Sequence, residues 1–231
     1  MIDLIFCAGG NPRLMDIAIS EGWLPGARSD HWAHVAVRFV DIDYKRPNWE
    51  RHLARVIKEQ PKYATVPDLR EDLLDEADIE RAVRQAEQLS SYCEVPLIVP
   101  KLPGQLSLIP EQFAVGYSVP STYGGAKYPI WELSGRRIHL LGGSPKKQYE
   151  AASYLAGMAT VISADGNYAT LMAKKYMEYW SSRRRWEHWP HWDKDEYYRC
   201  CQASLRNIYR MWQPAEQQME AETAALSLFL N

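Results

Sequence analysis

The sequence predicts an α/β protein built on a largely parallel β-sheet, and three observations support this fold class. Short apolar runs of strand length alternate with segments whose apolar residues recur at helical spacing, which is typical of βαβ units. These strand-length runs are almost continuously apolar, which indicates burial on both faces. The chain has 231 residues, of which 46% are hydrophobic, and can bury a large core. A TIM-like (β/α) barrel and a doubly wound sheet both fit, but no G-x-G-x-x-G motif follows the first strand, which disfavours a dinucleotide-binding sheet.

The first two predicted strands are each followed by an amphipathic helix. The strand at residues 2–7 (IDLIFC) leads through a turn into a helix at 13–20. The strand at 34–40 (HVAVRFV) precedes a helix at 48–59, for which Asn48 is the expected N-cap.

The middle of the chain supplies the third, fourth and fifth strands, which we expect at 63–66, 95–99 and 113–119. An acidic segment at 68–80 separates the third strand from the fourth. Its second half starts a helix that runs to about Ser90, because carboxylates suit the positive N-terminal end of a helix.

The last two predicted strands lie at 137–141 (RIHLL) and 160–163. A Gly-Gly-Ser-Pro turn ends the sixth strand, and a helix at about 146–155 follows it. The seventh strand runs into an Asp-Gly-Asn sequence, and another helix begins near Tyr168. No eighth strand is visible in the pattern, so the barrel is expected to be incomplete or to close irregularly.

The character of the sequence changes at about residue 176. We expect a catalytic barrel over 1–175 and a helical, aromatic and basic segment over 176–231 that packs on it. Residues 176–212 contain ten Trp and Tyr residues, and Arg183–Arg185 are consecutive arginines. The end of the chain, 214–231, is predicted to form a final helix.

The composition disfavours several classes of protein. The net charge of −2 argues against a grip on nucleic acid by the whole surface, although a local basic patch stays open. No basic leader or membrane-length apolar run is present, so we expect a cytoplasmic protein without a membrane partner. No cysteine pair has the spacing of a zinc site, so we expect reduced structural thiols, no metal and no cofactor. The four cysteines are Cys7, Cys93, Cys200 and Cys201.

Polar residues follow most of the predicted strands, where parallel α/β proteins place their active sites. Asp41 and Asp43 follow the second strand, Asp68 follows the third, and Asp165 follows the seventh. A single carboxylate in such a place is often a helix N-cap, but several at equivalent places favour a site. Aspartates around one pocket can supply a nucleophile for a sugar carbon and an acid/base for proton transfer.

Histidines do not add to this set of strand-end residues. His34 and His139 lie within predicted strands, and we interpret both as core or lining residues. Without histidine ligands near the strand ends, a transition-metal site is a disfavoured use of the aspartates.

The end of the predicted barrel resembles the tRNA-guanine transglycosylases. Residues 139–175 read HLLGGSPKKQYEAASYLAGMATVISADGNYATLMAKK, in which a strand ends in a Gly-rich turn and Pro, a helix follows, and the next strand ends in Asp. The resemblance covers about residues 34–175 in matching order and spacing. The upstream segments that carry it are RFVDIDY (38–44), YATVPD (63–68), PLIVPK (96–101) and FAVGYSV (113–119).

The chain departs from that family in three ways. The zinc-binding Cys/His module is absent. The family's Asp-Ser-Gly is replaced by Asp41-Ile42-Asp43, which leaves open whether Asp41 or Asp43 handles protons. The Gln expected after the fourth strand is replaced by Pro100-Lys101. A short chain without the zinc module is most similar to the compact phage and bacterial DNA 7-deazaguanine transglycosylases, and a phage-encoded member would act in the host cytoplasm.

The resemblance implies a pentosyltransferase that exchanges guanine in DNA for a 7-deazaguanine derivative. Asp165 would attack C1′ and form a covalent Asp–nucleic acid intermediate, and Asp41 or Asp43 would act as the acid/base. Asp68 would hydrogen-bond the edge of the base, and glycines would let the backbone approach its ring. The other substrate-binding residues that it implies are Lys101, Gly116, Ser118, Gly142, Gly143 and Asn167.

The C-terminal segment has the composition of a nucleic-acid contact. Its Tyr and Trp residues can stack on splayed bases, and its basic residues can meet phosphates. Trp-rich helices also cap barrels or form dimer faces, so a homodimer stays open. The basic candidates are Lys174, Lys175, Arg183, Arg184 and Arg185.

Three other functions compete with DNA base exchange. The same residues could act on RNA, as in the tRNA-guanine transglycosylases. A small-molecule N-glycosidase or nucleoside hydrolase could use the same carboxylates with water as the acceptor. A catalytically silent binding subunit is disfavoured, because Asp165 and Asp41 are both retained.

Overall fold

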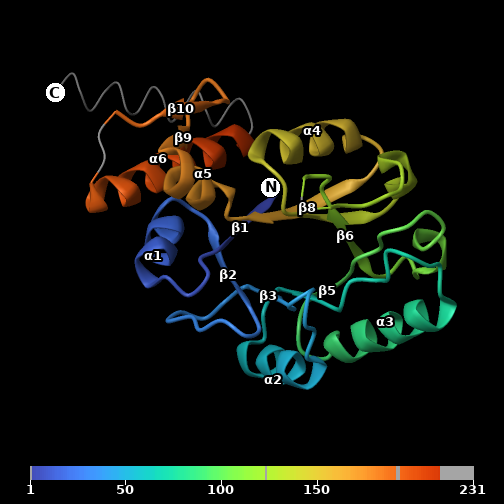
Figure 1. Ribbon diagram of the computed structural model, residues 1–231. Coiled ribbons are helices and arrows are strands. Elements are labelled where there is room, and N and C mark those ends of the chain that lie inside the picture. Colours follow the sequence, from blue (N-terminus) through green and yellow to red (C-terminus); the bar gives the residue numbers. More distant parts are fainter. Residues whose placement is uncertain (1, 123, 191–192, 214–231) are drawn as a thin grey trace. The chain divides into compact units, whose positions relative to one another are not determined.

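The computed structural model describes residues 2–122, 124–190 and 193–213, which form two compact units. The larger unit spans Ile2–Tyr168 and contains a closed barrel of eight parallel strands (Figure 1). The smaller unit begins at Ala169 and contains helices and a two-stranded sheet. The predicted α/β class and TIM-like barrel are therefore confirmed.

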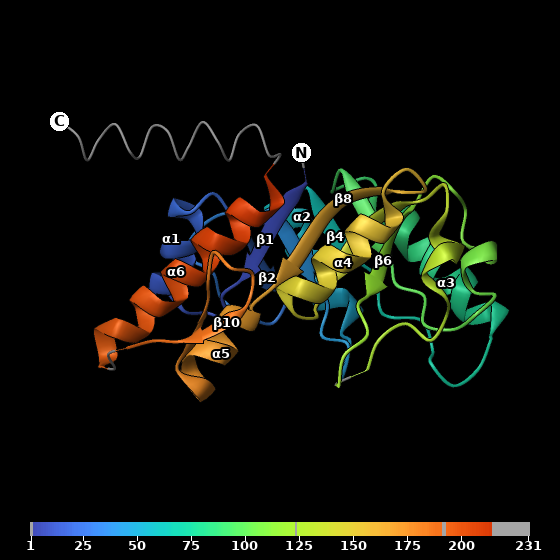
Figure 2. The same cartoon turned by 90° about the horizontal axis from the view of Figure 1, so that it is seen from above.

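The barrel strands follow one another round the ring in chain order. The last strand closes the ring by pairing with the first (Figure 2). In this pairing Ile5 lies opposite Asp165. A register shift between Ile138 and His139 interrupts the pairing of the last two strands. The strands are β1 (Asp3–Cys7), β2 (Leu24–Arg28), β3 (Phe39–Asp41), β4 (Tyr63–Thr65), β5 (Val95–Ile98), β6 (Ala114–Ser118), β7 (Arg137–Leu141) and β8 (Thr160–Gly166).

Four α-helices flank the barrel, and two short 3-10 helices follow β5 and β6 (Figure 1). Asn48 is the predicted N-cap, and its side chain accepts a hydrogen bond from the N–H of Arg51 at 3.0 Å. No helix among the described residues combines the length and apolar character needed to cross a membrane. The helices of this unit are α1 (Pro12–Ser20), α2 (Trp49–Glu59), α3 (Glu76–Leu89), η1 (Leu106–Leu108), η2 (Ile130–Leu133) and α4 (Pro145–Leu155).

The eighth strand, which the sequence pattern did not reveal, is β2. It reads LPGAR, and Pro and Gly both disfavour β-structure in a central strand. Gly26 is nonetheless suited to its place, because a Cβ there would lie 2.7 Å from Ile5 Cγ2 and 2.9 Å from Cys7 Sγ. The barrel is therefore closed, and the expectation of an incomplete barrel is wrong.

The strand predicted at 34–40 is also wrong over most of its length. Only its last two residues belong to β3, and residues 29–38 link β2 to β3 without a helix. His34 therefore lies in a loop, where its Nε2 is 2.7 Å from Asp16 Oδ1. Alternation of apolar residues in this loop imitated a strand, because Val37 is buried while its neighbours are exposed.

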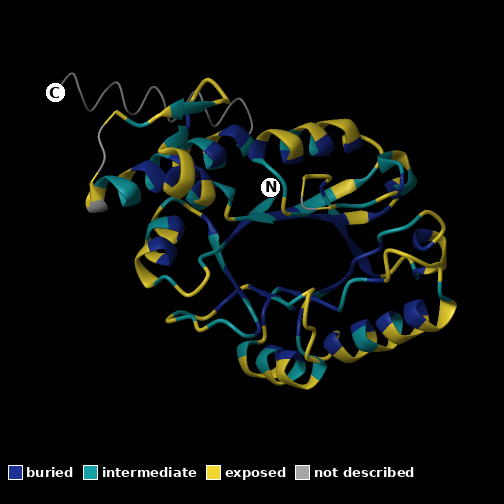
Figure 3. Cartoon of the chain, viewed as in Figure 1, coloured by how far each residue is buried: buried dark blue, intermediate teal, exposed yellow. Residues whose placement is uncertain are grey.

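The core lies both inside the barrel and between the barrel and its helices. Ile5, Phe39, Tyr63 and Leu97 fill the interior together with Ala114. A second cluster joins strands to the inner faces of α2 and α3, whose outer faces are exposed (Figure 3). Burial of this kind, at roughly 25 cal/mol per Å² of apolar surface, holds the strand ends in fixed positions.

The sequence suggested a helical segment here, but the smaller unit contains a β-hairpin as well as helices. A helix, α5 (Tyr168–Tyr176), leads into a hairpin of β9 (Glu178–Trp180) and β10 (Trp186–His188), and α6 (Lys194–Trp212) follows. Trp180 is buried, and its backbone N–H donates to Ser204 Oγ of α6 at 2.9 Å. The final helix predicted at 214–231 lies outside the described residues.

Candidate active site

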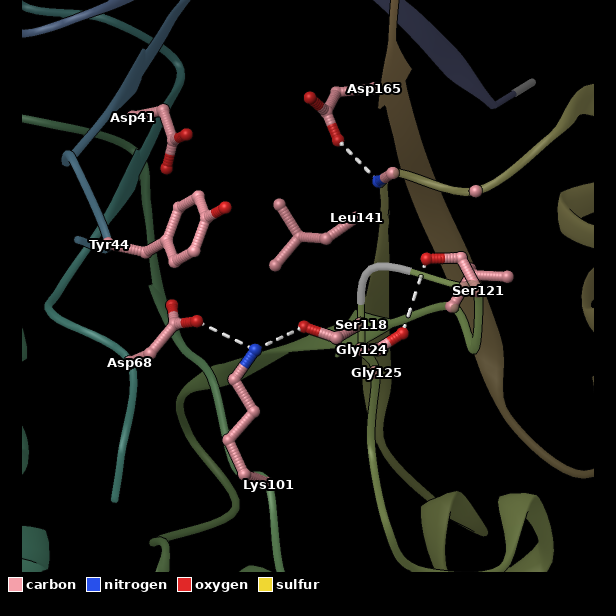
Figure 4. Close-up of a pocket in the computed structure, with 13 residues that line it drawn as sticks. Asp41, Tyr44, Asp68, Lys101, Ser118, Ser121, Gly124, Gly125, Leu141 and Asp165 are labelled. Carbon is pink, nitrogen blue, oxygen red and sulfur yellow. Dashed lines mark hydrogen bonds and ion pairs between the residues drawn. The ribbon is translucent and has the colours of Figure 1, made fainter. Parts of the chain in front are cut away.

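A pocket of about 270 Å³ lies at the carboxyl ends of the barrel strands. Asp41 and Asp165 project into it from opposite walls, and Leu141 lies between them (Figure 4). Asp68, Lys101 and Ser118 form a further polar wall. The lining consists of Asp41, Tyr44, Asp68, Lys101, Ser118, Val119, Ser121, Gly124, Gly125, Leu141, Gly142, Gly143 and Asp165.

Asp165 lies near the end of β8 and is held by the loop that follows β7. Its Oδ1 accepts a hydrogen bond from the N–H of Gly142 at 3.2 Å. The side-chain nitrogen of Gln148 donates to the carbonyl oxygens of Gly142 at 2.8 Å and of Asp165 at 2.7 Å. The Gln148 amide thus connects the loop to the end of β8. This connection holds the Gly142 N–H beside the carboxylate, which lines the pocket.

Asp41 ends β3 and lies in a less polar environment. Thr65 Oγ1 donates to Asp41 Oδ1 at 2.9 Å, and the same hydroxyl accepts the N–H of Ile42 at 3.0 Å. Burial, followed by the nearby charge of Asp165, raises the pKa of Asp41 to about 8. Asp41 therefore keeps its proton at neutral pH and can donate it.

The polar wall is a charge pair with a hydroxyl partner. Lys101 Nζ lies 2.6 Å from Asp68 Oδ2 and donates to Ser118 Oγ at 2.6 Å. Gln105 Oε1 accepts the N–H of Lys101 at 2.6 Å, so the backbone of this loop is fixed as well. The wall therefore presents a carboxylate acceptor and an ammonium donor side by side.

The predicted glycines divide into two groups. Gly142 and Gly143 line the pocket with φ of 62° and 80°, a conformation that glycine adopts without strain. A Cβ at Gly143 would lie 2.8 Å from Val119. Gly116 instead lies inside the barrel, where a Cβ would lie 2.7 Å from Leu141 Cδ1 and 2.8 Å from Val99 Cγ2. Its role in this structure is packing.

Two other predicted residues, Asp43 and Asn167, are not among the residues that line the pocket. Asp43 accepts the N–H of Lys45 at 3.1 Å, and its Oδ2 lies 3.5 Å from Arg28. Asn167 is exposed between β8 and α5. Of the two aspartates left open by the sequence, Asp41 is the one that lines the pocket.

Several residues of the site were missed at the level of sequence. Tyr44 points into the pocket from the loop after β3, and Thr65 bonds Asp41 (Figure 4). Gln148 fixes the Asp165 backbone from α4. Tyr44 follows Asp41 by three residues, and this proximity was the one available signal.

The basic candidates belong to the smaller unit. Arg183 and Arg185 lie in the hairpin turn with side chains 73% and 61% exposed, and both face Glu187, at 3.8 Å and 2.8 Å. Lys174 and Lys175 are exposed in the last turn of α5. Arg184 is exposed in the turn between β9 and β10, with φ of 58°. The hairpin turn therefore carries three exposed cations, and Glu187 of β10 offsets part of their charge.

The carboxylates of the pocket do not belong to a cluster of metal ligands among the described residues. Over residues 2–122, 124–190 and 193–213, no three His, Cys, Asp or Glu side chains gather closely enough to hold an ion. The four cysteines, Cys7, Cys93, Cys200 and Cys201, are free thiols.

Comparison with known proteins gives one family. The model of DUF6610, a family of unknown function, matches residues 18–213. No curated protein matches the chain.

Proposed function

The chain belongs to DUF6610, a family of unknown function, and we propose that it is a guanine transglycosylase that exchanges guanine in DNA for a 7-deazaguanine derivative. The observation that carries the proposal is the pairing of Asp41 and Asp165 across one pocket. One of these carboxyls holds a proton at neutral pH, and the other accepts a backbone N–H. Base exchange needs a proton donor and a carboxylate nucleophile in such an arrangement.

The first half of the reaction expels guanine. An oxygen of Asp165 forms a bond to C1′ while the bond from C1′ to N9 of guanine breaks, and the electron pair of that bond leaves with the base. Asp41 gives its proton to the departing base. The products are a glycosyl ester on Asp165, neutral guanine and the Asp41 carboxylate.

The second half installs the new base. The N9–H of 7-deazaguanine gives its proton to the Asp41 carboxylate, and N9 attacks C1′. The ester bond from C1′ to Asp165 breaks, and its electron pair returns to the carboxylate. Both aspartates end the cycle as they began, so neither a metal nor a cofactor is required.

The polar wall is suited to reading the edge of either base. Asp68 accepts the N–H groups at N1 and N2 of a guanine ring, and Lys101 donates to O6. Lys101 already donates to Ser118 and pairs with Asp68, so its ammonium is held in one place. The ring lies against Gly142 and Gly143, where no side chain intervenes.

The target guanine must leave the DNA stack to enter such a pocket. Exposed cations at Arg183–Arg185 and at Lys174 and Lys175 are candidates for phosphate contacts. Binding through these groups weakens as salt rises, because each phosphate contact releases condensed counterions.

One experiment tests this function. The purified protein is incubated with guanine-containing DNA or RNA and a 7-deazaguanine, followed by a denaturing gel and nucleoside mass spectrometry. We expect a covalent complex and base exchange in DNA, and neither with Asp165→Asn. Exchange in RNA alone would replace DNA with RNA as the substrate. Release of guanine without replacement would indicate an N-glycosidase with water as the acceptor. If neither polymer loses guanine, the proposal is wrong.

A further inference from the structure

Directly beneath Asp165, the barrel interior holds a buried histidine. His139 of β7 and Ser163 of β8 are both fully buried, and His139 Nδ1 lies 2.7 Å from Ser163 Oγ. The other ring nitrogen, Nε2, lies 3.5 Å from Asp165 Oδ1. The ring packs against Phe39 and Tyr63, with centroids 5.0 Å and 6.2 Å apart. His139 is therefore linked to the pocket through Asp165.

The Nε2 atom of His139 is an unsatisfied polar atom. It is buried and makes no hydrogen bond to the described residues. An unsatisfied buried donor costs about 1–3 kcal/mol, and such atoms are rare in folded proteins. A separation of 3.5 Å is long for a hydrogen bond, but catalytic hydrogen bonds often tighten when substrate binds. The nitrogen is thus poised to complete its bond at Asp165.

We propose that His139 is a positioning residue for Asp165, a role that rests on the function proposed above. We assign the donor role in the contact between Ser163 Oγ and Nδ1 to the hydroxyl, so that Nδ1 accepts and the ring proton lies on Nε2. The Nε2–H then donates to Asp165 Oδ1, which also accepts the N–H of Gly142. Two N–H donors on Oδ1 leave Oδ2 as the oxygen that bonds to C1′, since the donor that Oδ2 meets is the weakly bonding thiol of Cys7, with Sγ at 3.9 Å.

Neutral side chains surround the contact between His139 and Asp165. Burial raises the pKa of Cys7 well above its ordinary value, so its thiol stays neutral. Asp41 keeps its proton at neutral pH, as its pKa of about 8 requires. Burial also raises the pKa of Tyr63, whose phenol stays neutral. A carboxylate among neutral groups is stabilised most by an N–H aimed at it, which His139 supplies.

A matched pair of variants separates positioning from packing. Methionine and glutamine have similar size and shape, but only glutamine can donate a hydrogen bond. We expect His139→Met to lower kcat for base exchange about 10²-fold with little change in KM. His139→Gln should keep most of that rate, because its amide N–H can replace Nε2–H. If the Met variant matches the wild-type kcat, His139 only fills space.

A second measurement needs no enzymatic activity. Two-bond ¹H–¹⁵N spectra of the histidine side chains report which ring nitrogen carries the proton, and the His139 signals are identified by their loss in the Met variant. We expect an Nε2–H tautomer whose resonance moves in Asp165→Asn. Ser163→Ala should shift the Nδ1 signal instead.

These results distinguish the two proposals. If the wild-type protein exchanges no base, the proposed function is wrong, and the spectra still test the contact between His139 and Asp165. If the wild type is active but the His139 resonances are the same in the wild type and in Asp165→Asn, only the positioning role is wrong. Should the Met variant fail to unfold cooperatively, Ser163→Ala with the same spectra and kinetics decides the question, with about a 10-fold loss of kcat expected.

Discussion

Asp41 and Asp165 face the same pocket from β3 and β8, but the groups around them differ. Asp41 accepts one hydroxyl, from Thr65, in a buried setting that raises its pKa to about 8. Asp165 accepts a backbone N–H from Gly142 and faces the ring of His139. Two residues of one type are thereby suited to two tasks, since burial retains a proton and oriented donors stabilise a charge. The comparison teaches that the roles come from the surroundings of each side chain.

Replacing the carboxylate on the β8 side should have the largest effect. Asp165→Asn removes the proposed nucleophile and should lower base exchange by about 10⁴-fold or more, with no covalent complex on a denaturing gel. Asp16→Asn is the control, because Asp16 is 65% exposed and pairs with His34 in a loop. A covalent complex that persists in Asp165→Asn would assign the nucleophile to another residue.

Replacing the carboxyl on the β3 side should have the next largest effect. Asp41→Asn should lower exchange by roughly 10²–10³-fold, because an amide cannot return a proton. In the wild type, kcat/KM for DNA should fall as pH rises through about 8, where Asp41 loses its proton. The variant should lose this dependence in the same pH-rate measurement.

Asp43→Asn decides between the two aspartates of the β3 end. Asp43 bonds the N–H of Lys45 and faces Arg28, so its replacement should leave exchange within about 3-fold of wild type. A loss as large as that of Asp41→Asn would transfer the acid/base role to Asp43.

Changes in the polar wall should affect binding more than chemistry. Asp68→Asn breaks the pair with Lys101 and weakens an acceptor for the base, so KM for the 7-deazaguanine should rise about 10-fold, while kcat changes less. Asp72→Asn is the matched control, because Asp72 is 67% exposed and pairs with Arg70. A pure kcat effect in steady-state kinetics would contradict a role in base recognition.

The last expected effect is on stability and not on activity. Because the pKa of Asp41 rises from 3.8 to about 8 on folding, the folded protein loses stability as pH rises from about 4 to about 8. Asn carries no titrating proton, so the Tm difference between Asp41→Asn and the wild type should grow by about 10 °C between pH 5 and pH 8. Arg70 lowers the pKa of Asp72, so Asp72→Asn should show no growing gain. Equal Tm differences at both pH values would show that Asp41 is ionised throughout.

Strand positions were largely accessible to sequence reasoning, because buried strands carry dense apolar residues. β7 was predicted at its observed bounds, and Asp165 was placed at the end of β8. β2 was missed because Pro25 and Gly26 hide it, although the barrel interior demands a residue without a side chain at Gly26. Local propensity and tertiary packing conflict there, and packing prevails.

Contacts within the site were less accessible. Lys101 and Asp68 follow different strands, and their pairing depends on how two loops meet. His139 was interpreted as a core or lining residue, and it is buried, but its alignment with Asp165 depends on the register in which β7 pairs with β8. The hairpin of β9 and β10 was missed, because strands of three residues carry too little periodicity to detect.

The amide of Gln148 has a consequence for the tolerance of the site to motion. Its one nitrogen bonds the carbonyl oxygens of both Gly142 and Asp165, so a displacement of α4 carries donor and acceptor together. When both groups move together in this way, the distance from the Gly142 N–H to the Asp165 carboxylate changes little. The alignment of this pair can therefore outlast fluctuations of the helix that supports it, and the Gly142 loop can follow a bound base without releasing Asp165.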